Sequence, residues 1–159
     1  MTRRLALAAT LHDPTGALRA DSRRALPLLR ARYAHIAVCT SPPTATSIVT
    51  ELKAAGIYAG TPPANRRGPL YRLCVRRALV SNVDAIHYLD FDRVLHWFWS
   101  DPREYDRVLA RAVRGADLLL GRTPKAHRSH QRPLYATETI VNRLFAAQLG
   151  WRRPIDFFV

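Results

Sequence analysis

The alternation of short apolar runs with longer segments of helical periodicity limits the fold of this chain more than any other feature. The runs are continuously apolar, which is typical of strands covered on both faces of a parallel sheet. They occupy residues 5–10, 36–39, 57–59 and 85–89, with further candidates at 117–121 and 155–159. Helical crossovers between such runs predict an α/β three-layer sandwich with a mostly parallel, Rossmann-like sheet.

The segments between the runs carry the start and stop signals of helices. Ser100 or Asp101 is expected to cap one helix, with Pro102 at its first position. This helix is expected to begin only after the aromatic segment at 96–99. The expected helices cover residues 21–33, 44 or 46 to 55, 69–83, 101–114 and 137–149.

The composition is that of one globular domain spanning residues 1–159. A hydrophobic fraction of 48% provides enough apolar side chains for a core. No apolar run reaches the roughly 18 residues that read as a membrane span, so none is expected. Cys39 and Cys74 lie in apolar contexts, which predicts buried, reduced thiols in a cytoplasmic protein.

The net charge of +13 favours anionic ligands. Arginine supplies nearly all of the positive charge, because Lys53 and Lys125 are the only lysines. The arginines are spread over several expected helices and do not form one block with interleaved aromatic residues. A sugar nucleotide is therefore favoured over nucleic acid as the ligand, and nucleic-acid binding remains an alternative.

The run at 85–89 ends in two carboxylates, Asp90 and Asp92, separated by one residue. Two acids at one strand end repel each other and lose hydration on burial, so they need positive charge between them. A divalent cation, alone or with bound phosphates, supplies that charge. In a plainer interpretation, the two acids cap a turn or pair with Arg93 and other arginines.

In a doubly wound sheet, ligands bind beyond the carboxyl ends of the strands, where the strand order reverses. The segments expected at this place are residues 10–13, 40–41, 61–67 and 90–93. Together they offer hydroxyls, backbone donors, arginines and a carboxylate pair. This set suits a nucleotide diphosphate with a metal ion that bridges carboxylate and phosphate oxygens.

The order of the expected elements, up to the Asp-X-Asp sequence at 90–92, resembles the GT-A glycosyltransferases, which have the nucleotide-diphospho-sugar transferase fold. The resemblance covers roughly residues 5–123. It implies that Asp90 and Asp92 bind Mn²⁺ or Mg²⁺ on the diphosphate of a sugar nucleotide. Further nucleotide contacts are implied for Thr10, His12 and Asp13 in the first loop, and for Arg67 near the diphosphate. Asp13 is equally expected to be a turn residue.

The fold of that family usually continues beyond the length of this chain, with further strands that carry acceptor and catalytic-base residues. The apolar end of the chain, residues 157–159, resembles an interrupted element. A truncated enzyme, a domain completed in a homo-oligomer and a domain that no longer catalyses are all compatible with this. Glu138 and Asp156 are candidates for the catalytic base by position alone, and the acceptor is unknown. Glu138 and Asn142 form either a solvated helix face or part of the cleft.

Two alternatives to a transferase stay open. Residues 90–94 also satisfy the motif of the haloacid-dehalogenase-like phosphatases, with Asp90 as nucleophile and Asp92 as acid. That family usually places the motif on its first strand, whereas three strand–helix units precede it here. A following lysine and a second acidic pair are not evident. The other alternative is a non-catalytic nucleotide- or nucleic-acid-binding domain.

Four aromatic and histidine residues have two interpretations each. His96 and Trp97 either line a sugar pocket or belong to the core or a lid, and the second is favoured. His127 and His130 lie in a polar, basic stretch. They are interpreted as loop residues first and as metal ligands second, because a third ligand is not apparent.

Overall fold

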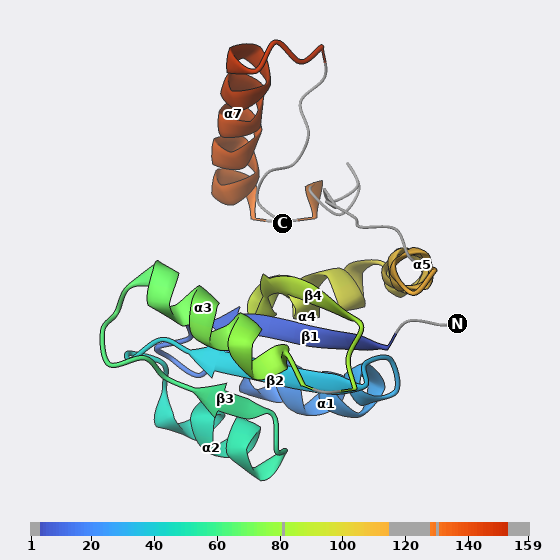
Figure 1. The fold of residues 1–159 in the computed structure, drawn as a ribbon. Coiled ribbons are helices and arrows are strands. Elements are labelled where there is room, and N and C mark those ends of the chain that lie inside the picture. Colours follow the sequence, from blue (N-terminus) through green and yellow to red (C-terminus); the bar gives the residue numbers. More distant parts are fainter. Residues whose placement is uncertain (1–3, 81, 115–127, 130, 153–159) are drawn as a thin grey trace.

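The computed structural model describes residues 4–80, 82–114, 128–129 and 131–152 (Figure 1). Strands of this part form one sheet, with the bounds β1 Leu5–Leu11, β2 His35–Thr40, β3 Tyr58–Gly60 and β4 Ala85–Asp90. The helices are α1 Arg19–Arg30, α2 Thr46–Ala54, α3 Arg67–Ala78, α4 Phe91–Ser100, α5 Pro102–Ala112 and α7 Arg132–Gln148. Within the described residues, no helix has both the length and the apolar character needed to cross a bilayer.

The strands all run parallel, in the order β3-β2-β1-β4. The chain moves outward from β1 through β2 to β3 and then crosses to the other side of β1, so the strand order reverses between β1 and β4. The register pairs Thr10 with Asp90, which brings the carboxyl ends of β1 and β4 to the same edge. The expected parallel α/β sheet is thus confirmed. The strand candidates at 117–121 and 155–159 lie outside the described residues.

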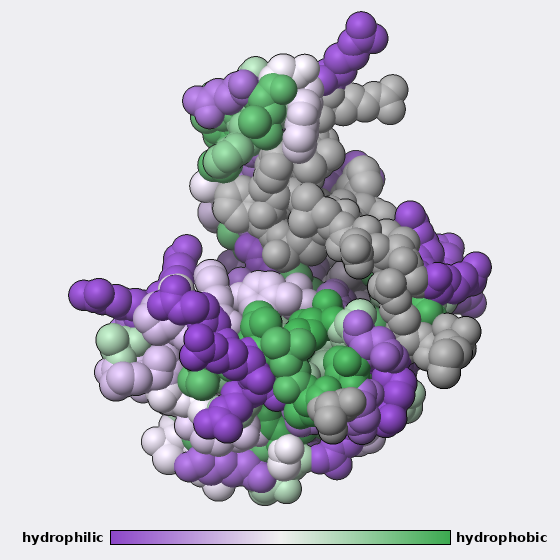
Figure 2. Space-filling model, in the orientation of Figure 1, coloured by the Kyte–Doolittle hydropathy of each residue, from purple (hydrophilic) through white to green (hydrophobic). Residues whose placement is uncertain are grey.

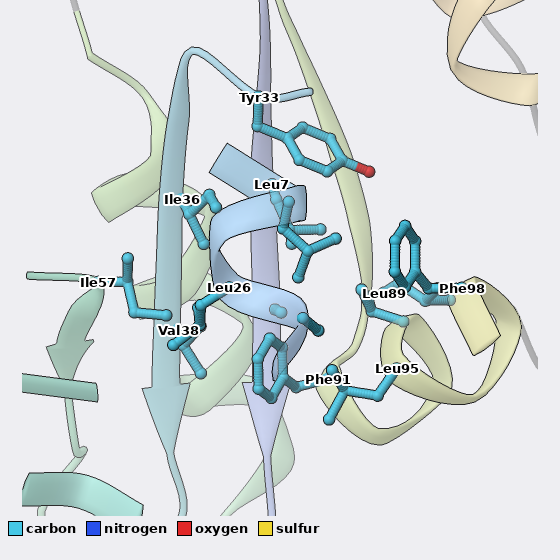
Figure 3. Packing of buried hydrophobic residues seen from close by; sticks show 14 of the residues in the cluster. Leu7, Leu26, Tyr33, Ile36, Val38, Ile57, Leu89, Phe91, Leu95 and Phe98 are labelled. Atoms are coloured by element: carbon cyan, nitrogen blue, oxygen red, sulfur yellow. The ribbon is translucent and has the colours of Figure 1, made fainter. Parts of the chain in front are cut away.

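Helices cover both faces of the sheet, as a three-layer sandwich requires (Figure 1). The larger core lies on the face covered by α1, α2, α4 and α5. In Figure 3, Leu7 and Val38 of the sheet meet Leu26 of α1 and the side chains of Phe91 and Leu95 from α4. Burial of these apolar surfaces provides the main driving force for this part of the fold.

The opposite face is covered by α3, which packs over small side chains. Ala6 and Ala8 of β1 and Ala37 of β2 are buried beneath it. Alanine lets a helix approach the sheet closely, so α3 is held directly above the strand pair β1–β2. Cys39 and Cys74 are buried in this layer as free thiols, as expected.

The helix α4 is the main departure from the sequence prediction. It begins at Phe91, directly after β4, so the aromatic segment at 96–99 lies inside an additional helix that comes before the predicted helix α5. Phe91, Val94, Leu95 and Phe98 are all buried, and their spacing of three and four residues gives the helix one apolar face. Packing of that face on β1 and α1 explains why the helix forms without a stretch of loop before it.

The other helix boundaries differ from the predictions by a few residues. The helix α1 starts at Arg19 and not at residue 21 or 22. The helix α3 ends at Ala78 and not near residue 83, because the backbone leaves the helical conformation at Leu79. The predicted cap of α5 is confirmed, since the Asp101 carboxylate accepts a hydrogen bond from the Glu104 N–H at 3.0 Å.

Candidate functional site

A cavity of about 750 Å³ lies over the carboxyl ends of the parallel strands. All four segments that the sequence predicted for this place contribute to its wall, and α3 and α7 add further residues. The lining residues from the strand ends and the start of α4 are Thr10, Leu11, His12, Ser41, Asp90, Asp92 and Arg93. The remaining lining residues are Asn65, Arg66, Arg67, Leu70, Tyr71, Leu134, Thr137 and Glu138. The cavity lies where the strand order reverses, which makes it the candidate site.

Thr10 and Asp90 connect the two strands at this reversal. The Thr10 hydroxyl donates a hydrogen bond to Asp90 Oδ1 at 2.5 Å. Thr10 is only 4% exposed, whereas the side chain of Asp90 is 44% exposed. The bond therefore orients one carboxylate oxygen of Asp90 while the group stays accessible from the cavity.

Asp92 lies in the first turn of α4, and its side chain also lines the cavity. Its side chain is accessible, but the protein atoms around the carboxyl still displace part of its water. This desolvation, followed by the negative charge of Asp90, raises the pKa of Asp92. The guanidinium of Arg93, which lies 3.8 Å from Asp90, offsets part of this rise, and a cation between Asp90 and Asp92 would offset more of it.

Positive charge also borders the cavity. Arg66 and Arg67 stand at the start of α3, where the helix dipole places partial positive charge. Arg93 contributes a third guanidinium from α4. Carboxylates, guanidinium groups and a helix N-terminus on the same cavity suit a ligand with both anionic and cation-binding oxygens.

Arg93 joins the sheet edge to the helix α7. Its Nη2 donates to Glu138 Oε1 at 2.8 Å, and its Nε lies 3.8 Å from Asp90 Oδ2. Glu138 is 2% exposed, so this ion pair is shielded from water on the Glu138 side. The pair holds the guanidinium of Arg93 beside Asp90 in the cavity wall.

His12 and Ser41 bridge the ends of β1 and β2. His12 Nδ1 lies 2.7 Å from Ser41 Oγ, which is in turn 3.1 Å from the Thr44 hydroxyl oxygen. The Thr44 hydroxyl donates to the carbonyl of Leu11 at 3.2 Å. This chain of hydrogen bonds fixes an exposed imidazole at the cavity wall, where a ligand can contact it.

Asp13 has a structural role in the loop between β1 and α1. Its carboxylate accepts hydrogen bonds from the backbone N–H groups of Ala17 and Leu18 at 3.1 and 3.0 Å. Gly16 has a φ of +74°, and a Cβ added there would lie 2.8 Å from Ser47 Oγ. Asp13 is 5% exposed and does not line the cavity, in agreement with its interpretation as a turn residue.

The aromatic residues of α4 do not form a sugar platform in the cavity. Trp97 is 2% exposed and packs edge-on against Tyr105 at 5.2 Å between ring centroids. Its Nε1 donates to Glu104 Oε2 at 3.2 Å. His96 lies near Ser100 and Ser129 and is not a lining residue. Trp97 is therefore a core residue, as favoured.

The helix α7 brings only part of its predicted face to the cavity. Glu138 lines it, whereas Asn142 is buried at 5% exposure and does not. Glu138 and Asn142 are thus not a solvated face. Asp156, His127 and His130 lie outside the described residues, so their predicted roles stay predictions.

Some lining residues were not singled out from the sequence. Asn65 and Arg66 belong to the loop predicted to reach the strand ends, and the adjacent pair of arginines was the available signal. Tyr71, Leu134 and Thr137 lie on helices, and nothing in their local sequence distinguishes them from other helix-surface residues. Only the packing of α3 and α7 brings them to the cavity.

The described residues of the cavity supply only part of the ligands that a metal ion needs. Among the described residues, no group of three or more His, Cys, Asp and Glu side chains could hold a metal by itself. Mg²⁺ in nucleotide sites is held by one or two carboxylates together with phosphate oxygens, and Mn²⁺ also prefers oxygen ligands. Asp90 and Asp92 fit that mode of binding, in which the ligand completes the coordination.

No family model matches the chain, and no curated protein and no solved structure is significantly similar to it.

Proposed function

We propose that this chain is a metal-dependent, glycosyltransferase-like domain that binds the diphosphate of a sugar nucleotide in the cavity at the strand-order reversal. The observation that carries the proposal is the convergence of Asp90 and Asp92 with three arginines on one cavity over the ends of β1 and β4. A nucleotide diphosphate with a divalent cation satisfies both signs of charge at once.

Each group has a distinct task in this proposal. Asp90 and Asp92 would hold Mn²⁺ or Mg²⁺, which would stabilise the negative charge that develops on the leaving diphosphate. Thr10 orients Asp90 through its hydrogen bond. Arg67 and the N-terminus of α3 bind phosphate oxygens from the other side. His12 offers an imidazole nitrogen to the nucleoside end of the ligand.

The strand order agrees with the GT-A resemblance. That fold needs the strand before its Asp-X-Asp sequence to lie beside the first strand, with a cleft over both ends. Here β4 pairs with β1, and the cavity is lined by residues that follow both strands. This agreement supports the proposal.

Glu138 is better suited to holding Arg93 than to acting as the catalytic base. A general base needs a carboxylate that is free to accept a proton from the acceptor hydroxyl. The Glu138 carboxylate already pairs with Arg93 at 2.8 Å and is almost fully buried. We therefore leave the base of the proposed transfer unassigned within the described residues.

A phosphatase of the haloacid-dehalogenase type is the second candidate. The raised pKa of Asp92 favours it, because the second aspartate of that motif acts as an acid. Against it, the part of the cavity wall that the structure describes contains no lysine. The phosphatase would release phosphate from a simple phosphomonoester in the presence of Mg²⁺, and Asp90→Asn would abolish this.

The test of the transferase-like function is calorimetric titration with UDP- and GDP-sugars in the presence and absence of Mn²⁺. We expect binding that needs the metal and is lost in Asp92→Ala. Asp21→Ala is the matched control, because Asp21 is also an acid in the first turn of a helix, with its side chain half-exposed, but does not line the cavity. Absence of binding to every nucleotide with metal present would refute the proposal.

A further inference from the structure

The segment from residue 65 to residue 83 concentrates positive charge. It contains no acidic residue, whereas it contains five arginines, and the helix α3 forms most of it. All five side chains belong to exposed residues. The arginines are Arg66, Arg67, Arg72, Arg76 and Arg77.

No acidic side chain in the described part of the chain forms an ion pair with these arginines. The arginines of α1 differ: Arg19 and Arg23 both pair with Glu51, at 2.9 and 2.6 Å. The positive potential of the chain is therefore directed outward at α3.

Apolar side chains form a stripe beside these arginines. Tyr71 and Val75 lie one helical turn apart on α3, and Leu79, which directly follows the helix, is 61% exposed. A shallow groove of about 380 Å³ is lined by Tyr71, Val75 and Tyr88 together with Arg72 and Arg76. Figure 2 shows apolar surface (green) in the region of α3 and β4, next to strongly hydrophilic side chains (purple).

We propose that this face of α3 docks on the surface of an anionic lipid bilayer. A membrane interface combines negative headgroups with an apolar layer beneath, and a helix face of arginines beside apolar side chains is complementary to both. A second copy of the chain does not fit, because the same five arginines on each partner would repel each other. Nucleic acid matches the charge but not the aliphatic Val75 and Leu79.

Docking by α3 has a consequence for the cavity. Arg66 and Arg67 belong to the same basic segment and also line the cavity. The cavity would therefore lie close to the membrane surface, where a membrane-bound acceptor is within reach. The docking itself does not depend on the proposed transfer reaction, since Arg72 and Arg76 do not line the cavity.

The experiment is co-sedimentation with vesicles of mixed phosphatidylglycerol and phosphatidylcholine, compared with vesicles of phosphatidylcholine alone. We expect binding to the anionic vesicles that weakens as salt is added. The double variant Arg72→Glu/Arg76→Glu should bind about tenfold or more weakly. The matched control is Arg107→Glu/Arg111→Glu, which makes the same change of charge at two exposed arginines four residues apart on α5.

A third variant separates the apolar contribution from the charge. Leu79→Asn keeps the charge and removes an exposed apolar side chain outside the helix, so it should weaken binding with little effect on folding. Circular dichroism checks that each variant is folded. The proposal is overturned if anionic vesicles do not retain the wild-type chain, or if both double variants lose binding equally. It is also overturned if the chain prefers duplex DNA to anionic vesicles at the same salt concentration.

Discussion

The hydroxyl of Thr10 lies 2.5 Å from Oδ1 of Asp90, across the two strands between which the strand order reverses. Eighty positions separate these residues in the sequence, and parallel pairing of β1 with β4 sets them side by side. The bond connects a buried hydroxyl to an accessible carboxylate at the proposed cation site. It is therefore expected to influence ligand binding more than folding.

Thr10→Val tests this expectation, since valine has nearly the shape of threonine and lacks the hydroxyl. Water can replace the lost donor at the accessible Asp90 carboxylate, so the free energy of unfolding should change by less than about 1 kcal/mol. Metal-dependent nucleotide binding should weaken about fivefold, measured by calorimetry. A large loss of stability with unchanged binding would show that the hydroxyl serves the fold alone.

Ionisation of Asp92 should lower the free energy of unfolding as the pH rises. Its pKa is raised in the folded state, so the folded chain binds this proton more readily than the unfolded chain does. The contribution of Asp92 to stability therefore falls as pH rises through that raised pKa. Asp92→Asn should raise the melting temperature at pH 7 and leave it nearly unchanged at a pH where the carboxyl is already protonated. Thermal melts of the wild-type chain and of Asp92→Asn at several pH values between these two conditions measure the difference in melting temperature.

The same raised pKa predicts the pH dependence of metal binding. A cation must displace the proton held by Asp92, so affinity for Mn²⁺ and nucleotide should increase as pH rises through the pKa of Asp92. Calorimetry at several pH values on the wild-type chain checks this. An affinity that stays constant over the interval would mean that Asp92 does not bind the metal.

Glu138 and Arg93 should be strongly coupled in stability. Glu138→Gln removes the charge opposite a guanidinium that is only 16% exposed, which should cost roughly 2–4 kcal/mol. Arg93→Met alone should cost a similar amount, because it leaves the buried Glu138 carboxylate without this partner. The double variant Arg93→Met/Glu138→Gln should lose less than the sum of the two single changes. Urea unfolding of the four proteins gives the coupling energy, and additive losses would contradict the prediction.

Because of His87, the free energy of unfolding should be lower in mild acid than at neutral pH. It lies among Tyr33, Trp97 and Tyr105, and its Nδ1 is 2.6 Å from the Tyr33 hydroxyl. Burial lowers the pKa of His87 to about 4. The unfolded chain binds a proton near the ordinary pKa of 6.5 and the folded chain does not. The free energy of unfolding should therefore fall by roughly 1–3 kcal/mol between these two values.

His87→Phe is the variant that tests this origin of the acid sensitivity. The change removes the titrating ring nitrogen and keeps an aromatic ring of similar size. The difference in unfolding free energy between pH 7 and pH 5 should shrink relative to the wild-type chain. An undiminished difference would assign the acid sensitivity to other groups.

Much of the architecture could be predicted from the local sequence, and the main error concerned the helix α4. The continuous apolar runs predicted β1, β2 and β4 because buried parallel strands need no polar face. The helix α4 was missed because Asp90 and Asp92 suggested a loop, although Phe91, Val94 and Leu95 already had helical spacing. Two acids at a strand end are compatible with both a loop and the first turn of a helix, and here the strand passes directly into a helix.

The segments that form the candidate site could be predicted, but the contacts between their side chains could not. Topology rules placed four segments at the strand ends, and all four line the cavity. The ion pair between Arg93 and Glu138 and the hydrogen bond from Thr10 to Asp90 were not predictable. Each depends on the exact approach of two elements, which side-chain packing sets and local pattern does not record.

The amino-acid sequence by itself determined the alternation of strands and helices, the pair Asp90 and Asp92 at a strand end, and the excess of positive charge. These are properties of short segments, because hydropathy, turn chemistry and charge act over a few residues. Only the tertiary structure decided that β4 lies beside β1, that Thr10 reaches Asp90, and that the arginines of α3 are exposed. Such relationships join residues far apart in the chain, and they arise when the whole sheet and its helices pack together.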